Sequence, residues 1–521
     1  MIRMACKKNP SVISLLFLLF TVTLSAQPII TLPRSVPEAE GVSSAGILSF
    51  LEATGKSKHE FHSFMFLRHG KVIAEGWWNP YNRDLKHTMY SVSKSFTSTA
   101  IGFAVSEKLL TVNDKVISFF PNYLPGSISG NLQELTVKHL LTMSVGQNPD
   151  PTTIIPGRDS NWIKAFLAMP IPNKPGSVFL YNSLATYMLS AIVQKVTGQK
   201  VIDYLTPRLF KPLGIQGMDW EVDPMGINTG GWGLRVKTED MAKLGQLYLQ
   251  KGSWNGKKLL PKEWTEEATT LKILQSPEAS QSKRDSSDWL QGYCYQFWRS
   301  RHNSFRGDGA FGQYILVLPE QDAVIAITSE TADMQGELNL VWDHLLPALK
   351  KDKLVPDKDV VLKLNRKLLS LALPLSVETA TPSFVAGISG KTFQIDKNED
   401  RIKSLSLQFA GDLCYLNVTS DTGSYKFGFS SSTWKTGETT KVGPYLLASA
   451  KARLSGLPPF KVAGHYTWTD KNTLQLTLRY IESPHRQKII CHFTENKILV
   501  DFENSINQGN RKGALKGELN N

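Results

Sequence analysis

Cysteine is scarce in this sequence, and the residue types that bind metals are not clustered. Four cysteines occur in 521 residues, and one of them, Cys6, precedes an apolar N-terminal run. The other three, Cys294, Cys414 and Cys491, are too few for a disulfide scaffold. A Cys414–Cys491 bridge and two free, buried thiols are both open at this stage. The histidines and cysteines form no C-x-x-C, H-E-x-x-H or H-x-H pattern, so the sequence predicts no metal site.

Long runs of one charge are also missing. The chain has 59 Lys and Arg against 46 Asp and Glu, a net charge of +13, but no five like charges follow one another. This spacing argues against a nucleic-acid-binding stripe and predicts at most weak association with anionic surfaces. Hydrophobic residues make up 41% and charged residues 20%, which excludes disordered, collagen-like and multi-span chains. The length favours two domains, or one large domain with an appendage.

The N-terminus has the pattern of a targeting segment. A basic start is followed by an apolar run over 12–20 and by small residues at Ser25 and Ala26. This order predicts a secretory signal peptide over 1–26, and hence export to the periplasm or the outside. The apolar run is short for a bilayer span. Leu24 fits the cleavage pattern poorly, so a cleaved and an uncleaved segment are both open.

The stretch from 27 to 350 alternates between strand and helix patterns. Strand patterns stand at both ends of it, and helix patterns fill the middle; the main ones are strands over 61–68, 72–78, 310–318 and 323–328, and helices over 91–110, 136–143, 161–169, 184–196, 238–249 and 338–349. This order predicts an α/β (α+β) domain with an antiparallel sheet assembled from both ends and a helical region inserted between them.

The rest of the chain differs in composition and residue pattern. Residues 351–386 are charged and contain prolines, which predicts a linker. Residues 387–504 carry short alternating runs separated by turn residues, typical of an all-β barrel or sandwich. The polar tail 505–521 is expected to be loose. Since 387–504 contains no motif other than Lys435-Thr436-Gly437, we expect a separable domain that the chemistry does not need.

The pair Ser91 and Lys94 is the strongest local signal for chemistry. It stands directly before the apolar run 96–105. Residues three apart share a helix face, so a helix starting at Ser91 would bring the lysine to the serine Oγ. Burial lowers the pKa of a lysine, which lets it act as a base near neutral pH. The Ser91 N–H, at a helix start, would be free to stabilise an oxyanion.

Together these segments resemble the penicillin-recognising serine hydrolases, which include class C β-lactamases, D-alanyl-D-alanine carboxypeptidases, esterases and 6-aminohexanoate-dimer hydrolases. Ser91-Val92-Ser93-Lys94 matches the first family motif. Tyr181-Asn182-Ser183 is similar to the Tyr-x-Asn motif, although Ser183 replaces the final Asn. The resemblance implies that Tyr181 relays a proton between Ser91 and the leaving group. It covers about 36–349 and is nearest to the 6-aminohexanoate-dimer-hydrolase and esterase branch.

Two segments compete for the third family motif, Lys-Thr-Gly or His-x-Gly on the strand beside the site. Lys435-Thr436-Gly437 matches by letter, but it lies in the β region and we interpret it as a chance match. The segment from Gly307 to Gly309 matches by context, because it precedes strand, turn, strand and helix patterns. It lacks the basic first residue. The resemblance implies that Gly307 and Gly309 line the substrate and that the N–H of Ala310 is the second oxyanion donor.

The leading hypothesis is therefore an exported serine hydrolase of β-lactamase/transpeptidase-like fold. It would cleave a small ester, amide or peptide-like substrate through an acyl-enzyme on Ser91, with Lys94 as base, Tyr181 as relay, Ser183 lining the substrate site and no cofactor. A β-lactamase or carboxypeptidase is the first alternative, in which Arg306 would meet a substrate carboxylate. A binding protein that has lost turnover is the second alternative. The sequence predicts no nucleic-acid partner and leaves the oligomeric state open.

Overall fold

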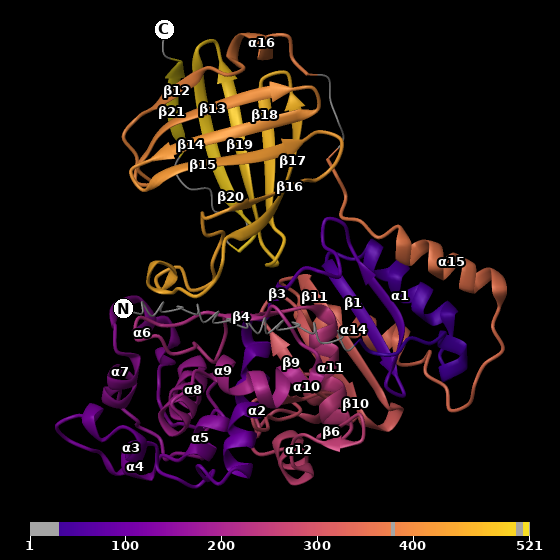
Figure 1. The fold of residues 1–521 in the computed structure, drawn as a ribbon, viewed down its shortest axis with the longest axis vertical. Helices are drawn as coiled ribbons and strands as arrows, with labels where there is room; N and C mark the ends of the chain where they lie inside the picture. The colour runs from indigo at the N-terminus through magenta and orange to yellow at the C-terminus, as the bar shows by residue number, and fades with distance from the viewer. Residues whose placement is uncertain (1–30, 377–380, 507–513, 520–521) are drawn as a thin grey trace, which may run out of the picture.

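The computed structural model describes residues 31–376, 381–506 and 514–519. The expected signal segment, 1–26, lies outside these residues. Figure 1 shows two domains, an N-terminal one of sheet and helices and a C-terminal β-barrel seated above it. Within the described ranges, no helix has both the length and the apolar character needed to cross a bilayer.

The N-terminal domain is built on an antiparallel sheet whose strands come from both ends of the domain. Its order is β2-β1-β11-β10-β9-β8, where the strands are β1 (Glu60–Arg68), β2 (Lys71–Trp77), β8 (Trp298–Arg299), β9 (Phe305–Gly309), β10 (Gln313–Leu318) and β11 (Ala323–Glu330). The sheet expected from the sequence is confirmed. One boundary differs, because β10 starts at Gln313 and the three residues before it form a turn. Phe311 and Gly312 have φ of 66° and 91°, which ends the extended run.

Alternating side chains along the strands bury both faces of this sheet. Met65 and Leu67 of β1 belong to the core on the side of α2 (Ser93–Ser106) and α11 (Thr238–Leu249). Phe64 and Phe66 belong to the core on the opposite side. That side is covered by α1 (Ser44–Lys56), α14 (Met334–Leu340) and the following π-helical turn η7 (Val341–Leu345). The sheet is therefore the central layer between two helical layers.

The inserted region is helical, as expected. It includes α5 (Val137–Leu141), α7 (Trp162–Ala168) and α8 (Ser183–Thr197), with the buried α2 packed against α8. The helix expected from Ser91 begins two residues later. Ser91 lies instead in a 3-10 turn, η2 (Tyr90–Val92), which leads directly into α2. Directly before η2 in the chain, β3 (His87–Thr88) pairs with β5 (Leu234–Val236).

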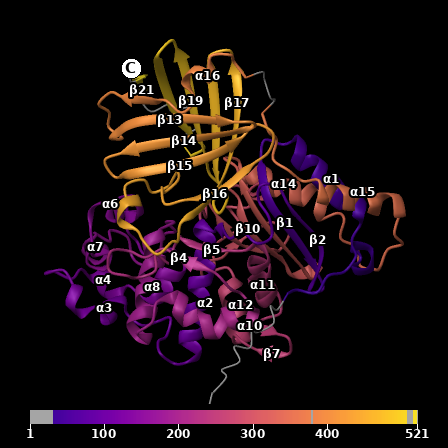
Figure 2. The same ribbon diagram turned by 45° about the horizontal axis from the view of Figure 1, so that its top comes forward.

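The expected linker over 351–386 contains an ordered helix. Within it, α15 (Lys358–Leu369) packs against α1 and β2, as Figures 1 and 2 show. Leu364 and Leu371 are buried there, and the chain continues as a bridge between Asn79 and Ala372. The polar composition hid this helix because only one narrow stripe of it is buried.

The C-terminal domain is a closed barrel, which decides between the expected barrel and sandwich. Its sheet has the order β15-β14-β13-β12-β21-β20-β19-β18-β17-β16, and a pairing of β15 with β17 closes it. The strands are β12 (Thr392–Ile395), β13 (Ile402–Ala410), β14 (Leu413–Ser420), β15 (Gly423–Ser430), β16 (Lys435–Thr439), β17 (Phe460–Asp470), β18 (Thr473–Tyr480), β19 (Arg486–Thr494), β20 (Lys497–Asn504) and β21 (Leu515–Leu519).

The tail contributes to the barrel instead of hanging loose. Its strand β21 pairs with β12 on one side and with β20 on the other. Leu515 is buried, and a Cβ at Gly517 would lie 2.6 Å from the Ile395 side chain, so the strand fits tightly. The expectation of a loose tail was wrong for these residues, because Leu515, Gly517 and Leu519 follow the two-residue period of a strand among polar neighbours.

Cys294, Cys414 and Cys491 are buried free thiols.

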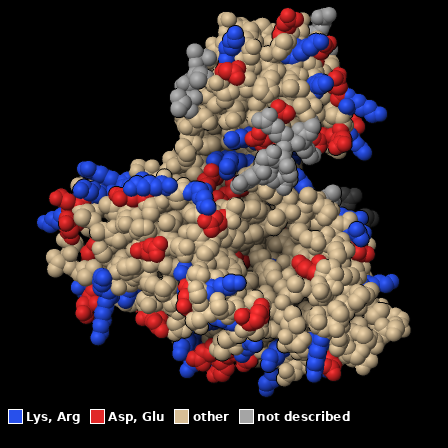
Figure 3. All heavy atoms as spheres, turned by 180° about the vertical axis from the view of Figure 1, so that it is seen from behind, with Lys and Arg blue, Asp and Glu red and all other residues tan. Residues whose placement is uncertain are grey.

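On the face drawn in Figure 3, acidic and basic side chains are interspersed, without a stripe of one sign.

Candidate active site

Ser91 and Lys94 meet at the junction of η2 and α2. Lys94 Nζ donates a hydrogen bond to Ser91 Oγ at 2.9 Å. Ser91 is half-buried, whereas Lys94 is buried with 1% of its surface exposed. The predicted spacing therefore brings the two side chains together, through a 3-10 turn that runs into the helix.

Two further acceptors hold the lysine. Lys94 Nζ donates to Ser183 Oγ at 3.0 Å and to the Gly231 carbonyl oxygen at 2.7 Å. Burial lowers the pKa of Lys94 to about 7, against smaller opposing effects of the Asp150 and Asp308 carboxylates. A lysine in this state is partly neutral near pH 7 and can accept a proton.

Ser183, which departs from the family pattern, thus accepts a hydrogen bond from Lys94. It is the first residue of α8, and Asn182 caps this helix by accepting a hydrogen bond from the Ala185 N–H at 3.1 Å. The Ser183 N–H donates to Thr152 Oγ1 at 3.0 Å, which fixes the start of the helix. A serine hydroxyl can therefore accept from Lys94 where the family motif has an amide.

The Tyr181 ring lies beside Lys94 Nζ. Lys94 Nζ is 4.8 Å from the centroid of the Tyr181 ring, and the ring stacks on Trp298 at 5.5 Å. Burial raises the pKa of Tyr181, while interaction with the Ser91 side chain opposes that rise. The phenol therefore keeps its proton at neutral pH beside both Ser91 and Lys94.

The strand β9 passes close to the start of α2. A Cβ at Gly309 would lie 2.4 Å from the Met89 carbonyl oxygen, and one at Gly307 would lie 3.0 Å from Ser95 Oγ. Only glycine fits at position 309, and its lack of a side chain allows β9 to lie against η2. Ala310 follows in the turn, half-buried, and its carbonyl accepts from Gln313 Nε2 at 3.1 Å.

Arg306, the candidate partner for a substrate carboxylate, is fully buried and faces other groups. Its Nε lies 2.8 Å from Asp308 Oδ2, and its Nη1 donates to Ser300 Oγ at 2.5 Å. The guanidinium also lies 4.5 Å from the Trp289 ring. Its charge is therefore already paired inside the protein.

The competing triplet Lys435-Thr436-Gly437 forms part of β16 in the barrel and pairs with Val462–Gly464 of β17. It belongs to the other domain, as expected from its polar surroundings. Within the ranges that the structure describes, no group of His, Cys, Asp and Glu is arranged to hold a metal ion.

Sequence reasoning missed the Gly231 carbonyl and the barrel residues beside Ser91. Gly231 contributes a backbone acceptor, which leaves no side-chain signal in the sequence. Tyr90, next to Ser91, contacts His485 of the barrel, 395 residues away. Such a contact between distant segments has no local pattern in the sequence.

The chain is similar to several known proteins. A 6-aminohexanoate-dimer hydrolase from Paenarthrobacter ureafaciens is 26% identical over 290 residues, covering 52% of this chain and 73% of that protein. An octameric penicillin-binding protein homologue from Pyrococcus abyssi is 16% identical with a TM-score of 0.45, covering 91% of this chain and 99% of the other. A penicillin-binding protein homologue from Caulobacter crescentus is 14% identical with a TM-score of 0.47, covering 58% and 99%.

The family profile described as Beta-lactamase matches residues 62–349, which is more than half of the chain. The matched range contains the sheet, the inserted helices and the whole cluster around Lys94. The chain therefore belongs to the beta-lactamase family of serine hydrolase folds, as its motifs indicated.

Proposed function

We propose that this protein is an exported serine hydrolase that cleaves an ester or amide through an acyl-enzyme on Ser91. The observation that carries the proposal is the buried Lys94, whose Nζ lies 2.9 Å from Ser91 Oγ and whose pKa is about 7. A serine is a weak nucleophile unless a neighbouring base takes its proton. The signal pattern at the N-terminus is the support for export.

In the first step, Ser91 Oγ bonds to the substrate carbonyl carbon while its proton passes to neutral Lys94. The Ser91 N–H, at the start of η2, and the N–H of Ala310 would donate to the oxyanion. When the carbon–oxygen or carbon–nitrogen bond breaks, Tyr181 gives its proton to the leaving group and recovers one from Lys94. Its raised pKa suits this role, because the phenol is protonated at neutral pH.

In the second step, water attacks the acyl-enzyme and releases the acid. The proton of the water returns through the same groups, and Ser91 Oγ leaves with a proton. Ser183 and the Gly231 carbonyl hold the lysine in place through both steps, since they accept from its other hydrogens. The chemistry uses only side chains and backbone groups of this chain.

The internal pairing of Arg306 speaks for an ester or a neutral amide over a β-lactam or a peptide with a free carboxylate. Arg306 is fully buried and its Nε is paired with Asp308, so a substrate carboxylate would have to reach a guanidinium that is closed to solvent. The similar protein from Paenarthrobacter ureafaciens is a 6-aminohexanoate-dimer hydrolase, so a linear amide dimer belongs among the substrates to be tested.

A fluorophosphonate probe tests the proposal directly. The wild-type protein should be labelled on Ser91, as located by peptide mass spectrometry, and should hydrolyse short p-nitrophenyl esters. Ser91→Ala and Lys94→Ala should lose both properties by several orders of magnitude, whereas Lys435→Ala should retain them. Labelling of Ser91 without turnover of short esters, aminohexanoate dimer or a cephalosporin would favour the binding-protein alternative. Ester turnover by Ser91→Ala above a few per cent would refute the assignment.

A further inference from the structure

The barrel contacts the segment that carries Ser91 through the turn between β18 and β19. The Glu482 carbonyl accepts from the Thr88 N–H at 2.9 Å and from Thr88 Oγ1 at 3.0 Å. The Ser483 carbonyl accepts from the Tyr81 hydroxyl at 3.0 Å. Arg235 Nη1 lies 3.1 Å from the Glu482 carboxylate. The turn is thus hydrogen-bonded to β3, which directly precedes η2, and ion-paired with Arg235 of β5.

His485, two residues beyond Ser483 in this turn, reaches the neighbour of Ser91. His485 Nε2 and the Tyr90 hydroxyl are hydrogen-bonded, and both side chains are buried. On its other side, His485 Nδ1 lies 2.7 Å from the Glu330 carboxylate. Since a carboxylate accepts, Nδ1 carries a hydrogen, and in the neutral imidazole Nε2 then accepts from the Tyr90 hydroxyl. Glu330 is in turn 2.6 Å from Arg486 Nη1.

Tyr90 has a backbone conformation that needs such support. Its φ is 45°, in the left-handed region that is strained for a residue other than glycine. The ring is enclosed by Phe311, with centroids 5.5 Å apart, and Phe311 meets His485 edge to face at 4.7 Å. The barrel histidine therefore fixes the residue that orients the Ser91 backbone.

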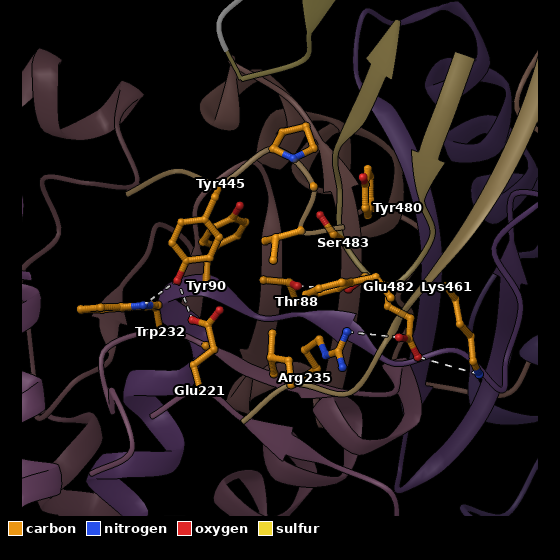
Figure 4. A pocket seen from close by; sticks show the side chains of 16 residues that line it. Thr88, Tyr90, Glu221, Trp232, Arg235, Tyr445, Lys461, Tyr480, Glu482 and Ser483 are labelled. Carbon is orange, nitrogen blue, oxygen red and sulfur yellow. Dashed lines mark hydrogen bonds and ion pairs between the residues drawn. The ribbon is translucent and has the colours of Figure 1, made fainter. Parts of the chain in front are cut away.

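A second barrel residue, Tyr445, holds the segment on the other side of the lysine. Its hydroxyl donates to Glu221 Oε2 at 2.6 Å and accepts from Trp232 Nε1 at 3.1 Å. Trp232 follows Gly231, whose carbonyl accepts from Lys94. Figure 4 shows Tyr445, Tyr90, Trp232 and Glu221 on one side of a cavity between the domains. The cavity measures about 590 Å³ including its open mouth, and residues of both domains line it.

We infer that His485 of the barrel is a positioning residue for Ser91, acting through the Tyr90 hydroxyl, and that the barrel completes the active site. This inference rests on the proposed function. It reverses the expectation that 387–504 is dispensable, because the residue before the nucleophile takes its hydrogen-bond partner from the barrel. Glu330 orients the imidazole for this contact, in the way that a carboxylate orients the histidine of a hydrolase triad.

Variants of the full-length chain separate positioning from simple domain adhesion. Tyr90→Phe removes one hydroxyl and keeps the ring, while His485→Ala removes both imidazole contacts. Each should lower kcat for a p-nitrophenyl ester by about tenfold or more with KM changed less than about threefold, since misplacing a nucleophile slows the chemical step. The rate of fluorophosphonate labelling should fall in parallel.

The amide pair His485→Gln and His485→Asn gives the sharper comparison. The glutamine amide reaches the position of Nε2, toward Tyr90, whereas the asparagine amide reaches only that of Nδ1, toward Glu330. Positioning predicts partial recovery with Gln and none with Asn, while a purely adhesive role predicts the reverse. His492→Ala is the control, because this histidine lies near the far end of β19 with 39% of its side chain exposed.

Labelling of the wild type makes the two failures distinguishable. If wild-type Ser91 does not react with the probe, the proposed function fails and the inference falls with it. If the wild type reacts and Tyr90→Phe, folded as judged by its melting temperature, reacts and turns over at the same rate, the inference alone is overturned. A lower melting temperature of His485→Ala would not save the inference in that case, because Tyr90→Phe provides the decisive comparison.

Discussion

Lys94 Nζ lies 2.9 Å from Ser91 Oγ, and each of the three acceptors recorded for this lysine is an uncharged oxygen. Asp150 and Asp308 act on it only from a distance. Among the described residues no carboxylate forms an ion pair with Lys94, and a buried ammonium in such a site is costly, so the site favours the neutral amine. This relationship suits the lysine to act as a base near neutral pH and leads to the first two predictions.

The value of kcat/KM for a neutral ester should rise with pH through an apparent pKa of about 7 and then level off. The sign follows from the role proposed for Lys94, which can accept the Ser91 proton only when deprotonated. A pH profile measured with a non-ionising p-nitrophenyl ester tests this. A rate that is flat between pH 5.5 and 9 would contradict a titrating lysine base.

Asp150→Asn should move that ascending limb to lower pH. The Asp150 carboxylate raises the pKa of Lys94 against the effect of burial, so its removal favours the neutral amine further. Asp159→Asn, at an exposed position nearby in the chain, should leave the limb in place. An alkaline shift in Asp150→Asn would mean that another group titrates.

Ser183→Ala should lower kcat by up to about tenfold, because it removes one of the hydrogen bonds that orient Lys94, and a hydrogen bond between uncharged groups contributes about 0.5–1.5 kcal/mol. Ser183→Asn should retain much more activity, since an amide oxygen can accept from the same amine. Ser190→Ala is the matched control on α8, as its hydroxyl donates to the Asn228 carbonyl instead. Equal losses in Ser183→Ala and Ser190→Ala would show only a general effect on the helix.

The sequence predicted most of what depends on local pattern. The strand runs, the inserted helices and the spacing of Ser91 and Lys94 follow from side-chain periodicity, and the structure confirms the sheet and the helical insertion. Ser183 looked like a weakness of the family match, yet its hydroxyl occupies a position on Lys94. A hydroxyl can take this position because a hydrogen bond from Lys94 needs only an acceptor atom.

Contacts between distant segments were beyond local patterns. Nothing near His485 marks it as a neighbour of Tyr90, and α15 resembles a solvated charged segment because only Leu364 is buried within it. The same holds for β21, whose pairing partners stand far apart in the chain. The place of β21 depends on closure of the barrel, that of His485 on docking of the barrel, and that of α15 on packing against α1 and β2.

Gly309→Ala should damage both stability and activity. Its Cβ would meet the Met89 carbonyl oxygen at 2.4 Å, and backbone cannot swing aside as a flexible side chain can. Overpacking of this kind costs about 1–3 kcal/mol, and it would push β9 away from η2. Gly437→Ala in the barrel triplet is the control, because its nearest contact is Val462 Cγ2 at 3.9 Å. Thermal unfolding and ester turnover measure both effects, and a wild-type-like Gly309→Ala would show that β9 does not constrain η2.

The docking of the barrel should weaken in acid. Arg479 Nη1 and Nη2 lie 2.5 and 3.0 Å from the two Glu60 carboxylate oxygens, across the domain boundary. Burial alone would raise the pKa of Glu60, but Arg479 and the hydrogen bond from His62 outweigh it and hold the pKa well below the ordinary 4.5. A carboxyl whose pKa is depressed in the folded state stabilises the fold at pH values above its unfolded pKa, and this contribution is lost as pH falls below about 4.5.

Urea unfolding of the full chain at pH 7 and pH 3.5 should therefore show a smaller acid-induced loss of unfolding free energy in Glu60→Gln, which cannot titrate, than in the wild type. Glu263→Gln, at an exposed position with an ion pair 3.8 Å long, should lose as much as the wild type. An undiminished acid loss in Glu60→Gln would assign the acid sensitivity to other groups.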